Sequence, residues 1–126
     1  MIRLIGIFAV IVTVVLAALA QIIVKQQLGQ IGPVPYSIVE WPRYTMRVLL
    51  NPVVLVGFSM AFLGAIIYLF AISRLPITYL YPFASLSFPV VLLLGTLVLG
   101  EPLTWQKALG SALIIGGVFI GSFSSV

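Results

Sequence analysis

Two polar side chains, Gln21 and Lys25, stand four residues apart near the end of the first apolar stretch of the chain. A spacing of four places both on one face of a helix, one turn apart. An amide followed by an ammonium group can receive a phosphate or a carboxylate. We interpret the two residues as a candidate site for an anionic group. The structural alternative is that Gln21 bonds a neighbouring helix and Lys25 extends its ammonium to the nearest polar layer.

Hydroxyl groups and prolines are concentrated in residues 77–99, which include Tyr81, Pro82, Ser85 and Pro89. Each proline removes a backbone donor and frees a carbonyl one turn earlier. In an apolar layer, such carbonyls need protein, hydroxyl or water partners. The pattern predicts a helix kinked at the two prolines, with its freed polar groups facing a cavity. Tyr68, at the end of the second apolar run, has a further hydroxyl. The candidate substrate-binding residues are Gln21, Lys25, Tyr68, Tyr81 and Ser85.

Four apolar runs, at about 4–24, 52–73, 77–99 and 105–123, must position these residues. Each is close to the ~20 residues that a helix needs to cross a bilayer core about 30 Å thick. The chain is 63% hydrophobic and only 6% charged, and no charge interrupts any run. Two of the connections are short, which makes neighbouring helices antiparallel. The sequence predicts an all-α membrane protein, a single domain over 1–126 with four transmembrane helices in an up-down antiparallel bundle.

The longest connection, about 25–51, contains a further predicted helix. The segment Trp41–Leu50 is typical of a short amphipathic helix, because Arg43 and Arg47 share one face. Its aromatic residues, including Tyr44, are expected to point towards acyl chains. This segment either anchors a solvated connector or contacts the substrate. The residues predicted to end the first helix are Gly29, Gly32, Pro33 and Pro35.

The first run imitates a secretory signal, since Arg3 precedes it and Ala18-Leu19-Ala20 resembles a cleavage site. The apolar run nevertheless continues to Val24, so we predict a retained helix, with both termini on one side of the membrane. Lys and Arg residues number two on that side and four on the other. This difference favours a cytoplasmic long loop with both termini outside, and its small size also permits insertion in both orientations.

Glycine residues mark helix faces that can approach one another closely. Gly57 and Gly64 belong to a stripe of small residues in the second run, and Gly110, Gly117 and Gly121 lie in the last. Four helices are too few to enclose a path for a solute. We therefore predict a dimer, with a second copy or a related small transporter, whose seam contains the three glycines of the last run.

The composition excludes most catalytic chemistry. The chain has no cysteine and no histidine, and its acids are Glu40 and Glu101. Disulfides, zinc sites and histidine-based catalysis are therefore absent, and we predict no metal, no cofactor and no enzymatic activity. The six Lys and Arg residues stand singly, without the basic cluster that nucleic acid requires. Glu101, followed by Pro102, is interpreted first as a helix N-terminal cap and second as a proton carrier.

Several short motifs resemble a known transporter family. Gly110–Val118, GSALIIGGV, is similar to the G-x-x-L-I-x-x-G-V dimerisation motif of small multidrug resistance proteins. The order AQIIVKQ, NP, YPFASLSF and LGEPLT resembles the drug/metabolite transporter superfamily, in particular its short EamA-like members that form the undecaprenyl-phosphate-aminoarabinose flippase. This resemblance implies four-helix protomers that pair and move a solute by alternating access, in the inner membrane of a prokaryote.

One departure from that family bears on the substrate. Small multidrug exporters place a glutamate in the first helix, where this chain has Ala17. Without that carboxylate, proton-coupled cation export loses both its binding charge and its proton carrier. The resemblance instead favours translocation of a polyprenyl-phosphate-linked sugar or a related anionic lipid, because the flippase-like members keep glutamine and lysine four apart. The alternatives are proton-coupled export of small cations or metabolites and a non-transporting accessory subunit.

Overall fold

The structure is a computed structural model that describes residues 1–123, and every regular element in this part of the chain is helical. The predicted single domain of 1–126 thus has its last three residues outside the described part. In chain order, the elements are α1 (Ile2–Ile31), the 3₁₀ helix η1 (Ile38–Glu40), α2 (Trp41–Leu49), α3 (Pro52–Arg74), α4 (Ile77–Ala84), α5 (Ser87–Val98) and α6 (Trp105–Gly121).

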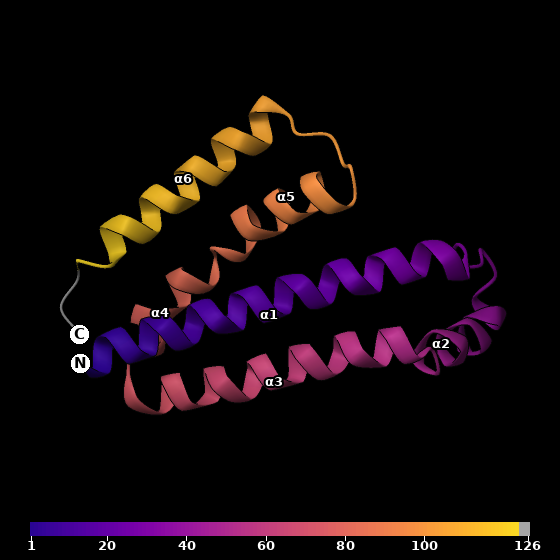
Figure 1. The fold of residues 1–126 in the computed structure, drawn as a ribbon, viewed down its shortest axis with the longest axis horizontal. Helices are drawn as coiled ribbons and strands as arrows, with labels where there is room; N and C mark the ends of the chain where they lie inside the picture. The colour runs from indigo at the N-terminus through magenta and orange to yellow at the C-terminus, as the bar shows by residue number, and fades with distance from the viewer. Residues whose placement is uncertain (124–126) are drawn as a thin grey trace.

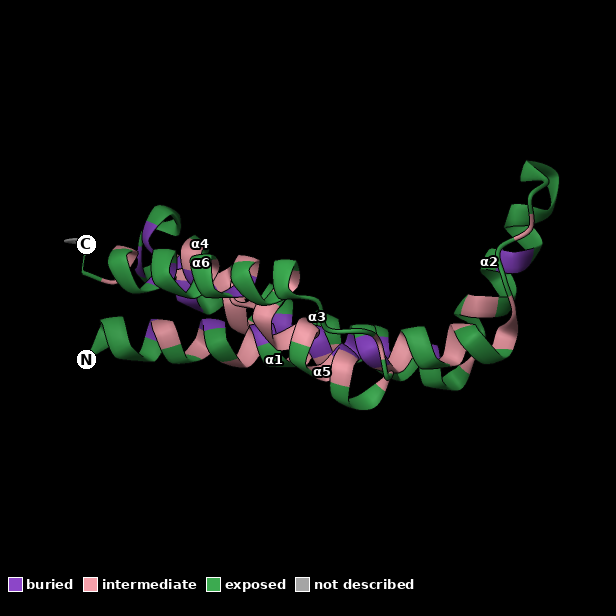
Figure 2. Cartoon of the chain, turned by 90° about the horizontal axis from the view of Figure 1, so that it is seen from above, coloured by how far each residue is buried: buried purple, intermediate pink, exposed green. Residues whose placement is uncertain are grey.

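Helix α1 lies in the middle of the molecule (Figure 1), with α3 along one side and α4 and α5 along the other. Helix α6 contacts α4 and α5 on their far side. The long helices alternate in direction along the chain, so the start of α1 and the end of α6 lie at the same end of the molecule. Figure 2 shows α2 at the opposite end, turned away from the layer formed by the other helices.

Three helical segments in the described residues are long and apolar enough to cross a membrane. They are α1, α3 and the segment Ile77–Val98, which contains both α4 and α5. Helix α6 is apolar and has 17 residues. It ends at Gly121, two residues before the predicted end of the run at residue 123. The fold is therefore all-helical with three membrane-capable segments.

Side-chain caps set the starts of α3 and α6. The Asn51 carboxamide oxygen accepts hydrogen bonds from the Val53 and Val54 amides at 2.9 and 3.3 Å, and Pro52 occupies the first turn. The Thr104 hydroxyl accepts from the Lys107 amide at 3.3 Å. Thr104 is thus the N-cap of α6, and the prediction that Glu101 caps this helix is wrong.

Helix α1 is longer than the sequence predicts, because it continues seven residues beyond Val24 to Ile31. The glutamines and Leu28 that follow Lys25 are good helix formers, and one glycine within them costs only about 1 kcal/mol. The helix ends at Gly32, whose φ of 115° is a conformation that favours glycine. Gly29 therefore does not break the helix. With 30 residues, α1 is about 45 Å long.

The run predicted as one helix over 77–99 forms two helices, interrupted between Ala84 and Ser87. Pro82 lies inside α4 and Pro89 in the first turn of α5. Because Pro89 has no N–H, the Ser85 carbonyl cannot receive the usual helical bond and instead accepts from the Phe88 amide at 3.2 Å. The Ser85 hydroxyl donates to the Pro82 carbonyl. The interruption therefore falls between the two prolines rather than at either.

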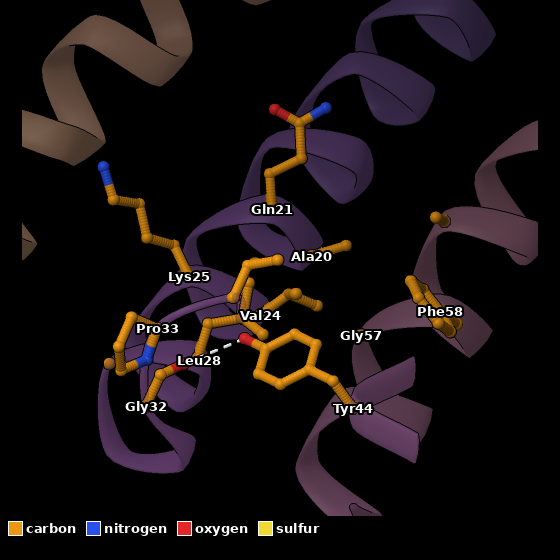
Figure 3. A pocket seen from close by; sticks show the side chains of 13 residues that line it. Ala20, Gln21, Val24, Lys25, Leu28, Gly32, Pro33, Tyr44, Gly57 and Phe58 are labelled. Carbon is orange, nitrogen blue, oxygen red and sulfur yellow. Dashed lines mark hydrogen bonds between the residues drawn. The ribbon is translucent and has the colours of Figure 1, made fainter. Parts of the chain in front are cut away.

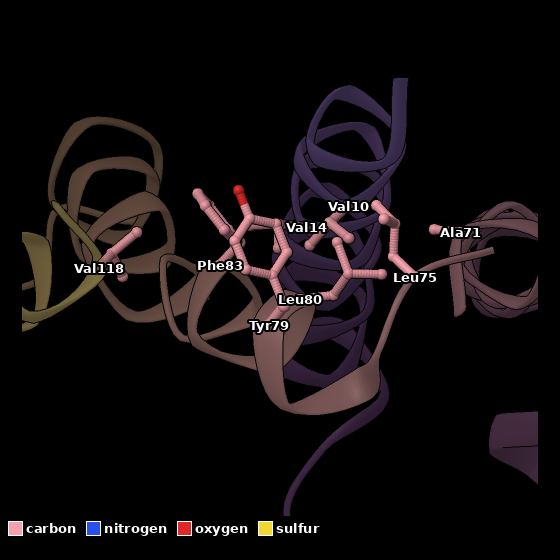
Figure 4. Close-up of a cluster of buried hydrophobic side chains, with 8 residues drawn as sticks. All are labelled: Val10, Val14, Ala71, Leu75, Tyr79, Leu80, Phe83 and Val118. Carbon is pink, nitrogen blue, oxygen red and sulfur yellow. The ribbon is translucent and has the colours of Figure 1, made fainter. Parts of the chain in front are cut away.

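Small residues bring α1 and α3 into close contact. A Cβ atom built on Gly57 would lie 2.7 Å from a Val24 methyl group and 3.2 Å from the Ala20 carbonyl oxygen. One on Gly64 would lie 3.4 Å from the Thr13 carbonyl oxygen. Around the other face of α1, a buried cluster joins four helices (Figure 4). Its members are Val10, Val14, Ala71, Leu75, Tyr79, Leu80, Phe83 and Val118.

Candidate functional site

An open groove of about 700 Å³ lies where α1 and α3 meet the segment that leads to α2. Its wall is almost entirely apolar, and two polar side chains, Gln21 and Lys25, also line it (Figure 3). Both residues belong to α1, where their spacing of four places them on one face. The apolar lining includes Val24, Leu28, Val34, Tyr44, Phe58 and Ala61.

Two hydrogen bonds fix the segment between α1 and α2, and the first of them joins two residues that line the groove. The Tyr44 hydroxyl donates to the Gly32 carbonyl at 2.9 Å, and the Trp41 indole N–H donates to the Pro35 carbonyl at 2.8 Å. Tyr44 is buried and its ring lines the groove, contrary to the expectation that it points outwards to acyl chains. The ring of Tyr44 lines the groove and its hydroxyl is hydrogen-bonded, so Tyr44 forms one wall of the groove in a fixed position. Arg43 and Arg47 of the same helix remain exposed.

Lys25 stands at the rim of the groove and points away from Tyr44 (Figure 3). Its ammonium lies 2.5 Å from Oε1 of Glu101, in the connection between α5 and α6. We call these two residues the rim pair. Their side chains are 66% and 40% exposed, so the rest of the protein does not enclose either charge. The rim pair joins α1 to the α5–α6 connection across 76 positions of sequence.

The backbone around Glu101 explains why its carboxylate reaches α1. Gly100 has a φ of 69°, in the left-handed region that favours glycine. This turn lets the Glu101 amide donate to the Gly95 carbonyl at 3.1 Å, beyond the last turn of α5. A Cβ atom at Gly95 would lie 3.4 Å from Glu101 Oε2, so the carboxylate lies close to this glycine. The hydrogen bond and charge of Lys25 lower the pKa of Glu101, and Lys107 lowers it further.

The other three predicted substrate-binding residues lie outside the groove. Tyr68 packs against the hydrophobic cluster, and its enclosed hydroxyl has no hydrogen-bond partner within residues 1–123. Tyr81 is 65% exposed, and the Ser85 hydroxyl is occupied by the Pro82 carbonyl. The structure thus brings Gln21 and Lys25 together and leaves Tyr68, Tyr81 and Ser85 elsewhere. Substrate binding by any of the five stays a prediction.

The glycines predicted to form a dimer seam have different surroundings. Gly110 and Gly121 face the protomer, since their Cβ positions would lie 4.0 Å from Phe88 and 3.9 Å from Pro82. Gly117 is exposed and has open space at its Cβ position. Of the three, only Gly117 presents a free surface.

Sequence reasoning missed two parts of this site, Glu101 as the partner of Lys25 and Tyr44 as a wall of the groove. The sequence contained a signal for Glu101, because Gly100 before it favours a sharp turn. This signal was not used, because Glu101 was interpreted as the start of the last helix. Among residues 1–123, no three His, Cys, Asp or Glu side chains gather as a metal site would need. The groove offers an apolar surface for hydrocarbon and a charged rim for a polar group.

Three membrane-capable segments, of which α1 and α3 line the apolar groove, indicate a multi-pass membrane protein. The chain is similar to two curated proteins described as probable 4-amino-4-deoxy-L-arabinose-phosphoundecaprenol flippase subunit ArnE. It is 38% identical to the one from Pseudomonas fluorescens over 55 residues, 44% of this chain and 48% of the relative. It is 39% identical to the one from Pseudomonas savastanoi pv. phaseolicola over 57 residues, 45% and 50% of the two chains.

The matched region spans about half the length of these curated relatives. No family model matches the chain, and no solved structure matches it. The resemblance to aminoarabinose-phosphoundecaprenol flippase subunits, predicted from the short motifs, is confirmed. Both relatives are named as probable flippase subunits, and a flippase is a membrane transporter.

Proposed function

We propose that this chain is a subunit of a membrane flippase that translocates a polyprenyl-phosphate-linked sugar or a related anionic lipid. The observation that carries the proposal is the groove, whose apolar wall ends at a lysine. A polyprenyl chain requires an extended apolar surface, and its phosphate requires a cation near the level where the hydrocarbon ends. Lys25 provides that cation at the groove's rim. The names of the two relatives support the same class of substrate.

We further propose four membrane crossings, with α6 as the fourth. Its 17 residues cover about 26 Å, slightly less than the ~30 Å hydrocarbon core. The uncharged residues Leu103 and Thr104 before it and Phe123 after it supply the remainder. Helix α2 then lies at the membrane surface with its arginines towards the head groups.

In this proposal the subunit acts in the inner membrane of a bacterium, in a pair with a second copy or a related small transporter. The free surface at Gly117 supports a contact through α6, because close approach of two helices needs a residue without a side chain. Transport would follow an alternating-access cycle of the pair.

Substitution of Lys25 tests this proposal in proteoliposomes that contain a short-chain polyprenyl-phosphate sugar. Lys25→Ala should weaken lipid binding by at least about tenfold, since a hydrogen bond to a charged group contributes more than 1.4 kcal/mol. Lys25→Glu should weaken it further, and Lys25→Arg should retain part of the binding because the charge survives. Arg43→Ala is the matched control, since Arg43 is an exposed cation outside the groove.

Uptake of a hydrophobic cation, measured on the same variants, tests the exporter alternative. A cation exporter should tolerate or benefit from the loss of a positive charge at its portal. If Lys25→Glu binds the lipid normally while cation uptake changes, the flippase proposal fails and an exporter takes its place.

A further inference from the structure

A second groove, of about 430 Å³, lies between α1 and α3 at the end of the molecule where α1 begins (Figure 1). We call it the Arg74 groove, after the last residue of α3. Along α1 it extends from Ile2 to Ala9, which is about 10 Å of helix. Its lining is apolar except for Arg74 and Ser73, and the Ser73 hydroxyl already donates to the Phe70 carbonyl at 2.7 Å. Arg74 is therefore the one charged group among the described residues that line this groove.

The Arg74 groove does not continue into the larger groove at Lys25. Between the two grooves, α1 and α3 are in close contact at Thr13 and Gly64, one turn beyond Ala9. A hydrocarbon chain that enters the Arg74 groove must therefore leave it sideways into the bilayer. A lipid bound there stays in the leaflet that holds its head group, so we treat it as a resident lipid and not as a transported one.

The charge at this end of the molecule is positive and has no acidic counterpart. The Arg74 guanidinium makes no hydrogen bond or ion pair with any of residues 1–123. Arg3, in the first turn of α1, adds a second guanidinium, which lies 5.1 Å from the centre of the Tyr79 ring. The two acids of the chain lie elsewhere, Glu40 in η1 and Glu101 in the rim pair. An anionic group at this groove is thus attracted by two cations, whereas a zwitterionic group brings an ammonium of its own towards them.

An anionic phospholipid fits both the charge and the apolar wall. A guanidinium can bind a phosphate through two parallel hydrogen bonds, and its long stem lets it remain at the level of the head groups. Ile5 and Phe70, which line the groove and are exposed, offer a surface for the first part of an acyl chain. Basic hollows between membrane helices bind anionic lipid head groups in the same way.

We propose that the Arg74 groove binds a resident anionic phospholipid of the bilayer, with its phosphate at Arg74 and one acyl chain against Ile5 and Phe70. The inference goes beyond the proposed function and does not rest on it, because it concerns another groove, another cation and a lipid that is not transported.

Quenching of a single tryptophan by brominated lipids tests the inference in the full chain. Phe70→Trp places the probe in the groove, and Trp41→Phe with Trp105→Phe removes the two native tryptophans. The probe chain is reconstituted into phosphatidylcholine bilayers that contain either brominated phosphatidylglycerol or brominated phosphatidylcholine. Phosphatidylglycerol should bind about fivefold more tightly, the preference expected from one arginine near an anionic lipid. Equal affinities would overturn the inference.

Substitutions of Arg74 in the probe chain identify the cation. Arg74→Gln should abolish the preference for phosphatidylglycerol, and Arg74→Lys should retain part of it, because the charge survives without the planar fork. Arg43→Gln is the matched control and should leave the preference unchanged, since Arg43 is an exposed arginine of α2. A preference that survives in Arg74→Gln would overturn the inference.

Filling the groove separates a binding site from an arginine that merely meets passing lipids. Ala9→Leu adds bulk to the groove wall and leaves every charge in place, so it should weaken binding of both brominated lipids. Unchanged binding would overturn the inference, because it would place the preference at the open protein surface. If Ala9→Leu or Arg74→Gln does not insert into membranes, the comparison of the two lipids in the probe chain still decides.

Inorganic phosphate distinguishes a lipid from a free anion. Added at the concentration of the brominated phosphatidylglycerol, it should not relieve the quenching, because it has no acyl chain to place in the groove. Relief of quenching by inorganic phosphate would overturn the assignment to a phospholipid.

Discussion

The Thr13 hydroxyl of α1 lies 2.9 Å from the carbonyl oxygen of Gly64 in α3. It lies at the same distance from the Ala9 carbonyl one turn earlier, so its single hydrogen is shared between two acceptors. A Cβ atom at Gly64 would lie 3.4 Å from the Thr13 carbonyl oxygen, in van der Waals contact, so the two backbones lie close together at this position. Thr13→Val should therefore reduce the free energy of unfolding by only about 0.6 kcal/mol, the average for hydrogen bonds between membrane helices. Unfolding in mixed micelles would measure it, and a loss of several kcal/mol would contradict a shared bond.

Substitution of Gly57 should have a larger effect. A Cβ atom there would overlap a Val24 methyl group and press on the Ala20 carbonyl oxygen, which is backbone and cannot rotate away. Gly57→Val should reduce the free energy of unfolding by about 1–3 kcal/mol. Gly29→Ala is the matched control in α1, because nothing lies within 4 Å of that position. The control should leave stability unchanged or raise it by up to about 1 kcal/mol, and equal losses in both variants would contradict the close contact.

Replacement of Pro89 should affect the interruption between α4 and α5 more than replacement of Pro82. Pro89→Ala restores the amide that the Ser85 carbonyl lacks, whereas Pro82→Ala restores one inside α4. Spin labels placed near Ile77 and Val98 should report a longer separation in Pro89→Ala, because a continuous helix is straighter. An unchanged spin-label distance in both variants would show that the prolines do not cause the interruption.

We also expect Pro82→Ala to reduce transport more than expression if the freed backbone faces a cavity.

The α6 glycines allow assembly to be separated from folding. Gly117→Leu should weaken subunit pairing without unfolding the protomer, because the position is open. Gly121→Leu should instead destabilise the protomer, where its side chain would meet Pro82. Crosslinking in membranes measures pairing, and folded yield in detergent measures the protomer. Normal pairing of Gly117→Leu would place the interface on another surface.

The rim pair should persist into mildly acidic conditions. The Lys25 hydrogen bond lowers the pKa of Glu101 below its ordinary value of 4.5, and the Lys107 charge acts in the same direction. A lowered folded-state pKa means that the stabilising contribution is complete above the ordinary value and is lost as pH falls through the lowered one. Labels at Gln26→Cys and Leu103→Cys, introduced into a chain without cysteine, should keep the same separation until pH falls below 4.5. Separation near neutral pH would contradict this assignment.

Local signals in the sequence predicted the starts of the helices better than their ends. The predicted runs begin at residues 52 and 105, as α3 and α6 do, although the cap of α6 was assigned to Glu101 and not to Thr104. The end of α1 was placed too early because Gly29 was given more weight than the helix formers around it. The prolines predicted a kink in the third apolar run, residues 77–99. The position of the break between the two helices could not be predicted, because it depends on which backbone carbonyl loses its hydrogen-bond donor.

The candidate site was only partly predictable for a different reason. Gln21 and Lys25 could be found because their spacing is local. Glu101 reaches Lys25 through a tertiary contact that no short pattern records, and Tyr44 lines the groove because the backbone at Gly32 turns back towards α2. Gly100 indicates a turn before Glu101, but no local pattern indicates that this turn brings Glu101 to Lys25 or that Tyr44 reaches Gly32.

Because α1 is long, the thickness of the bilayer determines how deep Lys25 lies in the membrane. About 31 Å of apolar helix precede Lys25, which matches the ~30 Å hydrocarbon layer, and the remaining turns extend beyond it. In a thinner membrane, α1 must tilt or its apolar end must enter the head-group region, whereas a thicker membrane draws the ammonium towards hydrocarbon. Lipids with different acyl lengths should therefore change the depth of Lys25 relative to the phosphate plane, without any change in the protein sequence.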